Sequence, residues 1–129
     1  MQIKKFIGEN EFLSNHHAST IVYKGTKYKT VTHAYQSLKC KHPTDAALVR
    51  SALTPEDAVT KARSCARRDD WQLVCGGIML ELLRLKFENP FLAPRLVATG
   101  DVVLGDGRNF VGKLLMEVRR ELNSEKEQK

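Results

Sequence analysis

The chain has 129 residues, of which 42% are hydrophobic and 28% are charged. This length and composition fit one globular domain with one core and argue against wholesale disorder. The formal net charge of +6 suits a phosphate or nucleic-acid ligand, and it equally suits a solvated basic surface. No apolar run approaches the length of a membrane span and no signal-type apolar segment follows the first residues, so we expect a cytoplasmic protein.

The cysteine and histidine patterns favour neither a disulfide framework nor a metal site. The three cysteines include no CxxC pair, which indicates reduced thiols in a cytosol-like compartment. His16 and His17 are consecutive, so their side chains diverge on any regular element, and no nearby acid or thiol completes a ligand set. No nucleophile elbow accompanies the serines and histidines. We therefore expect no metal, no cofactor and no catalytic triad.

Short β elements are predicted near the amino terminus. Residues 3–7 are expected to form the first strand. Residues 12–17 begin apolar and become polar, as a loop leaving the core does. Residues 20–23 and 27–29 flank a glycine-containing turn, which is typical of a β-hairpin.

Residues 30–39 are predicted to form a helix with Thr30 as its N-cap. A polar stripe of Thr32, Gln36 and Lys39 runs beside the core-facing side chains. In one interpretation the Lys39 stem lies along the core edge and Gln36 faces water. In the other, the stripe lines a pocket, and a buried Lys39 with a lowered pKa could form a Schiff base with a sugar aldehyde. The core-facing stripe consists of Val31, Ala34, Tyr35 and Leu38.

Further helices are predicted along the rest of the chain. Thr54, followed by a proline and two acids, is a strong helix start. The longest helix is apolar on two sides, which predicts a central position, and its Gly76 and Gly77 indicate close packing against another element. The domain is expected to span residues 1–123, with a polar tail at 124–129. The predicted elements are helices over 45–52, from 54, from 69–70, over 91–98 and from 110, and a strand over 101–104.

The loop at residues 105–109 is a second candidate site. Glycines such as Gly107 let the backbone approach a phosphate, and the following helix start attracts negative charge. Arg108 adds a cation beside Asp106 and Asn109. The spacing matches neither a P-loop nor a dinucleotide fingerprint, and a tight turn with a positive φ at Gly107 gives the same pattern.

Several short motifs follow one another along nearly the whole chain: Phe12-Leu13-Ser14-Asn15, Tyr28 with Thr30, His33-Ala34-Tyr35-Gln36 with Lys39, Asp70-Trp71, Lys86-Phe87 with Asn89-Pro90, Ala98-Thr99-Gly100-Asp101, and Asn109 with the run from Gly112 to Arg119. In this order they resemble the NADAR family, also called YbiA-like. The resemblance implies a compact, mostly helical α+β domain.

The resemblance also implies a function. Family members are expected to bind ADP-ribose-like or ribosyl-phosphate ligands and to cleave N-glycosidic bonds, for example in ADP-ribosylated guanine or ribosylated pyrimidine intermediates of riboflavin synthesis. The resemblance implies that the lysine with which family members form a Schiff base corresponds to Lys39 in this chain. Asn15, Tyr35 and Gln36 would position the ligand, with Trp71 near the base or sugar. The basic residues Arg63, Arg67 and Arg68 suit a modified nucleic acid as a further partner, and they equally suit a diphosphate.

Two departures from the family pattern leave two hypotheses open. The motif glutamate is replaced by Thr32, which cannot act as a carboxylate acid or base, and a Trp-Gly segment is absent where residues 104–107 stand. The chain is therefore either an N-glycosidase in which Asp101, Asp106 or a water replaces the acid, or a binding protein that sequesters an ADP-ribose-type or cyclic nucleotide. Thr32 favours binding, and Lys39 favours catalysis.

Overall fold

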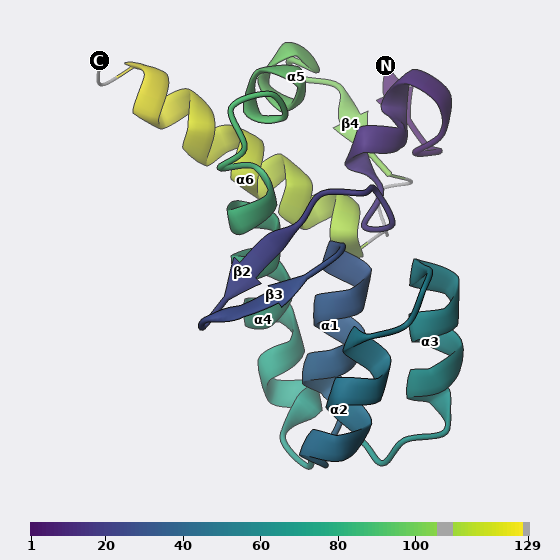
Figure 1. The fold of residues 1–129 in the computed structure, drawn as a ribbon. Helices are drawn as coiled ribbons and strands as arrows, with labels where there is room; N and C mark the ends of the chain where they lie inside the picture. Colours follow the sequence, from purple (N-terminus) through teal and green to yellow (C-terminus); the bar gives the residue numbers. More distant parts are fainter. Residues whose placement is uncertain (106–109, 128–129) are drawn as a thin grey trace.

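In the computed structural model, which describes residues 1–105 and 110–127, most of the chain is helical and two small sheets complete an α+β fold (Figure 1). The expected fold class is confirmed. The helices are η1 (Gly8–Leu13), α1 (Val31–Lys39), α2 (Pro43–Arg50), α3 (Pro55–Arg63), α4 (Trp71–Lys86), α5 (Ala93–Ala98) and α6 (Phe110–Glu127). The strands are β1 (Gln2–Ile3), β2 (Ile21–Tyr23), β3 (Thr26–Tyr28) and β4 (Val103–Leu104).

The elements gather at two ends of the molecule, with α4 running between them (Figure 1). Helices α1, α2 and α3 pack on one another at one end. At the other end α6 packs on α5 and on β4, which pairs in parallel with β1. The antiparallel β2–β3 hairpin lies against α4. None of the described helices is both long and apolar enough to cross a membrane.

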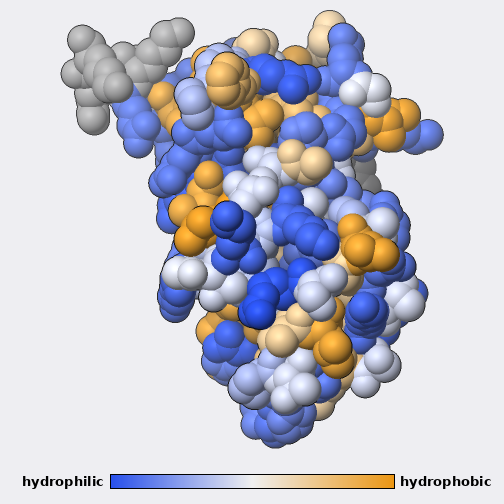
Figure 2. Space-filling model, in the orientation of Figure 1, coloured by the Kyte–Doolittle hydropathy of each residue, from blue (hydrophilic) through white to orange (hydrophobic). Residues whose placement is uncertain are grey.

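The main core joins the two ends through α1, α4 and α6. Leu82 and Leu83 of α4 and Leu115 of α6 are fully buried in it, together with Ala34 of α1. A smaller core lies between α2 and α3 and consists of Val49, Ala52, Ala58 and Ala62. On the face shown in Figure 2 the exposed hydrophobic residues are scattered among hydrophilic ones, as on an ordinary protein surface.

Both predicted threonine caps are present. The Thr30 hydroxyl accepts a hydrogen bond from the backbone N–H of His33 at 3.1 Å, and Thr54 accepts one from Asp57 at 3.0 Å. The buried His33 ring also lies 2.9 Å from the Thr30 hydroxyl and donates through Nε2 to the Ala52 carbonyl at 3.0 Å. The start of α1 is thereby fixed to the connection between α2 and α3.

Several expected boundaries are corrected by the structure, among them the start of α5, at 93 instead of 91, and the start of β4, at 103 instead of 101. The first strand covers only Gln2–Ile3, because its partner β4 offers just two residues for pairing. Helix α2 begins at Pro43, since a proline suits the first turn of a helix, where its missing N–H is not needed. Helix α6 continues to Glu127, well into the segment expected to be a frayed tail.

The close-packed glycine is not where the sequence suggested. A Cβ atom on Gly77 would meet nothing within 4 Å, and one on Gly76 would make only ordinary contact with the Phe110 ring at 3.8 Å. On Gly112 of α6, by contrast, a Cβ atom would lie 2.2 Å from the carbonyl oxygen of Leu104. Helix α6 can therefore approach β4 only because residue 112 has no side chain.

Helix α4 also differs from its expected pattern at two positions. Leu73 is 88% exposed, although the sequence predicts a helix that is apolar on two sides and buries its leucines. Lys86 is instead 1% exposed. The described helix buries Met79, Leu82, Leu83 and Lys86 on one face, which is the i, i+3, i+4, i+7 spacing of a core-facing stripe with a lysine at its last position.

Candidate functional site

A cavity of about 280 Å³ lies between the loop after η1 and helices α1, α3, α4 and α6. The loop and α1 supply its polar wall, whereas the other three helices supply apolar side chains. The polar residues are Ser14, Asn15, His16, Thr32, Tyr35 and Gln36, and the apolar ones are Val59, Met79, Phe110 and Val111. The polar stripe of α1 therefore does line a pocket at Thr32 and Gln36.

Two side-chain oxygens in this wall are buried without a partner. Neither Asn15 Oδ1 nor Gln36 Oε1 accepts a hydrogen bond within the described part of the chain. Asn15 Nδ2 donates to the Met79 sulfur at 3.6 Å, a weak acceptor. Turning the Asn15 amide over would set its oxygen against the Met79 sulfur, which cannot donate, so at least one polar atom of this side chain lacks a described partner in either orientation. Buried polar atoms without a hydrogen-bond partner cost free energy, and a ligand with donor groups would satisfy them.

The loop is fastened to α1 at the motif position that departs from the family pattern. His16 Nδ1 lies 2.6 Å from the Thr32 hydroxyl oxygen. The backbone N–H of Thr32 donates to the Asn15 carbonyl at 3.1 Å. Thr32 is 5% exposed and faces the cavity, while His16 is exposed. The Thr32 side chain thus connects a buried cavity wall to a solvent-accessible imidazole.

Tyr35 presents a hydroxyl that keeps its proton. Burial, aided by the neighbouring Cys75 thiol, raises the pKa of Tyr35 to about 12. Its ring centroid lies 4.9 Å from that of Trp71, with the two planes tilted by 59°. Trp71 is buried at the start of α4 and does not line the cavity. The structure therefore places Trp71 behind Tyr35 rather than against the ligand space.

Lys86 supports the loop after η1 through a hydrogen bond. This role was not predicted from the sequence. Its ammonium donates to the Ser14 carbonyl at 2.8 Å and lies 5.2 Å from the Phe87 ring centroid. Burial lowers the pKa of Lys86 to about 7, against a small opposing effect of the Glu11 carboxylate. The signal that could have revealed it is its spacing from Met79, Leu82 and Leu83.

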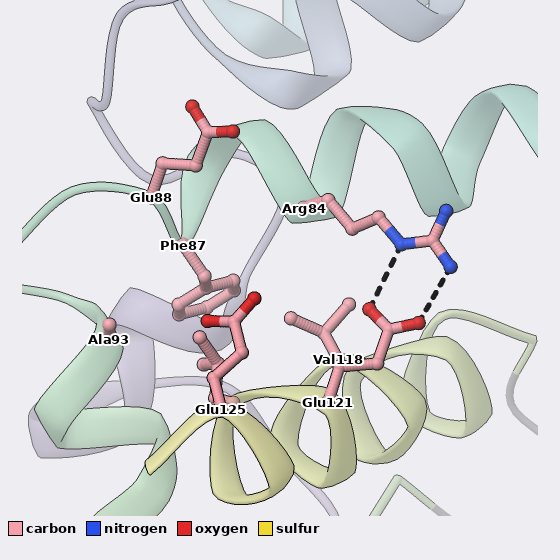
Figure 3. Close-up of a pocket in the computed structure, with 8 residues that line it drawn as sticks. Arg84, Phe87, Glu88, Ala93, Val118, Glu121 and Glu125 are labelled. Carbon is pink, nitrogen blue, oxygen red and sulfur yellow. Dashed lines mark hydrogen bonds and ion pairs between the residues drawn. The ribbon is translucent and has the colours of Figure 1, made fainter. Parts of the chain in front are cut away.

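A larger cavity, of about 630 Å³, opens between the end of α4 and α6. Figure 3 shows Arg84 of α4 and Glu121 of α6 pointing toward each other across it, joined by two hydrogen bonds of 2.9 and 2.6 Å. Glu88 and Glu125 add further carboxylates. We refer to this cavity as the α4–α6 groove.

The family model described as the NADAR domain matches residues 4–105 of the chain. The chain belongs to the NADAR family. The expected family is thereby confirmed.

Two relatives and one solved structure resemble this NADAR chain over most of its length. An N-glycosidase of Nostoc punctiforme is 34% identical, with 86% of this chain and 85% of that protein covered. A riboflavin biosynthesis protein of Vibrio vulnificus is 33% identical over 86% of this chain, which spans only 35% of that longer protein. The NMR structure of Escherichia coli YbiA shares 27% identity and a TM-score of 0.86, covering 100% of this chain and 88% of YbiA.

The remaining NADAR site residues expected from the sequence fall into four groups. Asn15, Thr32, Tyr35 and Gln36 come together around the small cavity. Lys39 is half-buried at the end of α1, one turn beyond Gln36, and does not line it. Asp101 is exposed beside a separate depression formed by α6 and the segment before β4. Asp106, Gly107 and Asn109 lie outside the described residues.

The described lining of the small cavity therefore contains no carboxylate, lysine or arginine. No cluster of three or more metal-ligating side chains occurs elsewhere in the described residues. Cys40, Cys65 and Cys75 are free thiols. What the described lining offers a ligand is neutral hydrogen bonding from two amides, a phenol and two hydroxyls, together with one imidazole.

Proposed function

We propose that this NADAR protein is an N-glycosidase that binds the ribosyl part of an N-glycoside in the small cavity. The substrate class is an ADP-ribosyl or ribosyl-phosphate compound such as ADP-ribosylated guanine. The observation that carries the proposal is the pair of buried, unpartnered oxygens of Asn15 and Gln36. A ribose offers neighbouring hydroxyl donors that would satisfy both.

The size of the cavity supports a nucleoside-sized occupant. Pockets for whole drug-sized ligands begin at roughly 300 Å³, and this one measures about 280 Å³. A ribose with part of its base fits that space, so the phosphates of the substrate would lie outside it. The Nostoc relative, which carries the name N-glycosidase, supports the reaction class.

The attacking group is assigned to Lys39, which would form a Schiff base with the opened ribose. Lys39 lies three residues after Gln36 and four after Tyr35, so it shares their side of α1. Its amine would need to extend by one helical turn to reach the cavity. Borohydride reduction in the presence of substrate would trap the adduct, and Lys39→Met would remove it.

The absence of any carboxylate or lysine from the described lining favours a second candidate function. In that case the cavity holds an ADP-ribose-type or cyclic nucleotide and sequesters it without cleavage. Asn15, Tyr35 and Gln36 would bind the sugar just as in an enzyme, because none of these contacts requires proton transfer.

One experiment separates the candidates. The protein is incubated with ADP-ribosylated guanosine and, separately, an ADP-ribosylated oligonucleotide, and mass spectrometry follows release of free ADP-ribose. Release supports the N-glycosidase. Retention of an unaltered nucleotide through gel filtration supports sequestration. If neither substrate binds, both functions are wrong. A steep loss of oligonucleotide affinity with salt, set against the affinity for free ADP-ribose, would identify a nucleic-acid partner.

A further inference from the structure

We propose that His16, held by Thr32, is the proton-transfer residue of the small cavity and takes over the task of the motif glutamate that Thr32 replaces. The inference rests on the proposed N-glycosidase function. It assigns that reaction a group which the described lining otherwise lacks, since no carboxylate is present there.

The geometry around His16 fixes one ring nitrogen and leaves the other available. Nδ1 lies 2.6 Å from the Thr32 hydroxyl oxygen, whereas Nε2 makes no hydrogen bond with any described residue. The backbone N–H of His16 donates to the Ser14 hydroxyl at 3.1 Å. A ring that is held at one nitrogen, and whose other nitrogen bonds to none of the described residues, has the arrangement that a general acid or base requires. Exposure of His16 to solvent allows its proton to be replenished.

Four other titratable side chains of the described residues near His16 are engaged or hold their protons. Tyr35 keeps its proton because burial raises its pKa to about 12. His33 is held at both ring nitrogens, by Thr30 and by the Ala52 carbonyl. The Lys86 amine is buried on the Ser14 carbonyl. Adjacent to His16, His17 lies 2.5 Å from the Glu11 carboxylate and does not line the cavity.

The proton balance of the reaction is simple. As the bond between ribose C1′ and the base nitrogen breaks, its electron pair stays on that nitrogen, which receives the proton carried by His16. One water then supplies its oxygen to C1′, either directly or by hydrolysis of the Lys39 adduct, and returns a proton to His16. The net reaction consumes one water and leaves His16 as it began. The departing base needs this proton in either route.

The test compares His16→Asn with His17→Asn. Asparagine keeps a hydrogen-bonding atom near the place of Nδ1 but cannot carry the proton. For His16→Asn we expect kcat to fall by roughly 10² to 10⁴, with KM and ADP-ribose affinity close to wild type and the imidazole limb of the pH–rate profile lost. His17→Asn should retain wild-type kinetics. Thr32→Val should lose roughly tenfold in kcat with the loss of one hydrogen bond, and Thr32→Ser should restore it.

The outcomes distinguish this inference from the proposed function. If wild type releases ADP-ribose and His16→Asn does so equally fast, His16 has no role in proton transfer and the N-glycosidase stands. If His16→Asn loses ligand affinity in proportion to its rate, His16 is a binding residue and the inference is wrong. If wild type cleaves no N-glycoside, both fail together. Circular dichroism of each variant confirms the fold, and Thr32→Val supplies an independent perturbation of the same pair.

Discussion

The small cavity and the α4–α6 groove share α6 but differ in how their polar groups are satisfied. The first turn of α6 contributes Phe110 and Val111 to the cavity, and its later turns contribute Val118 and Glu121 to the groove. In the larger groove the principal charges satisfy each other: hydrogen bonding to Arg84 lowers the pKa of Glu121. In the smaller cavity neutral oxygens are buried without partners.

This difference indicates that volume is a poor guide to function in this molecule. An ion pair that is already made on a half-exposed surface adds little stability and offers a ligand few unsatisfied groups. A buried acceptor without a donor costs about 1–3 kcal/mol until something binds it. We therefore propose the smaller cavity as the functional site, and variants in each of the two regions test that proposal.

The largest effect is expected from Gly112→Ala. The new Cβ would lie 2.2 Å from the Leu104 carbonyl oxygen, so α6 must move away from β4. This movement would also displace Phe110 and Val111, which line the small cavity from the first turn of α6. We expect a loss of about 3 kcal/mol in the free energy of unfolding, typical of overpacking at a rigid contact, and weaker ADP-ribose binding. Urea denaturation measures the first quantity.

Gly77→Ala is the matched control, because its Cβ would meet nothing within 4 Å and the position is exposed on α4. Replacing a helical glycine there should raise stability by about 0.5–1 kcal/mol. Equal destabilisation by both substitutions would show that the close α6–β4 contact is not the cause of the loss in Gly112→Ala.

Gln36→Leu should separate function from stability. It removes an unpartnered buried acceptor, so the free energy of unfolding should stay unchanged or rise by about 1 kcal/mol. The affinity for ADP-ribose should fall by roughly tenfold or more, since one sugar hydroxyl loses its acceptor. Calorimetric titration and thermal denaturation measure the two quantities. The exposed Gln72→Leu should alter neither affinity nor fold, and wild-type affinity in Gln36→Leu would remove this residue from the site.

Much of the fold was predictable from local sequence. Thr30 and Thr54 begin helices where predicted, because a cap requires only a side-chain oxygen and the next few N–H groups. The polar stripe of α1 was equally visible from spacing alone. Residues within one helix have fixed relative positions, so Thr32 and Gln36 had to share a side whatever the rest of the chain did.

The contacts between distant segments were not predictable in the same way. Pairing of His16 with Thr32 depends on where the loop after η1 crosses α1, and no local pattern fixes that crossing. The close approach of Gly112 to Leu104 likewise depends on how α6 docks, so the glycines of α4 attracted the packing hypothesis instead. Lys86 is intermediate, because its spacing indicated burial although its charge argued against it.

Lys86 gives a pH dependence that tests support of the cavity loop. Burial lowers its pKa from 10.5 to about 7. Between these values the unfolded chain holds a proton that the folded chain has released, so stability should rise with pH. Relative to Lys86→Met, wild type should gain about 1 kcal/mol per pH unit from pH 7.5 to 9.5, with no relative change below the folded pKa. Parallel curves across the window would show that the Lys86 amine is not desolvated.

The smallest effect is expected in the α4–α6 groove. Glu121→Gln weakens both hydrogen bonds to Arg84, but the two side chains are 33% and 47% exposed, so solvent screens the pair. The free energy of unfolding should fall by less than about 1 kcal/mol. Release of ADP-ribose should proceed at the wild-type rate, because the described linings of the groove and of the small cavity share no residue. If Glu121→Gln abolished turnover while Gln36→Leu left it intact, the ion-paired groove would be the site, and unpartnered oxygens would have been the wrong criterion for choosing between the two regions.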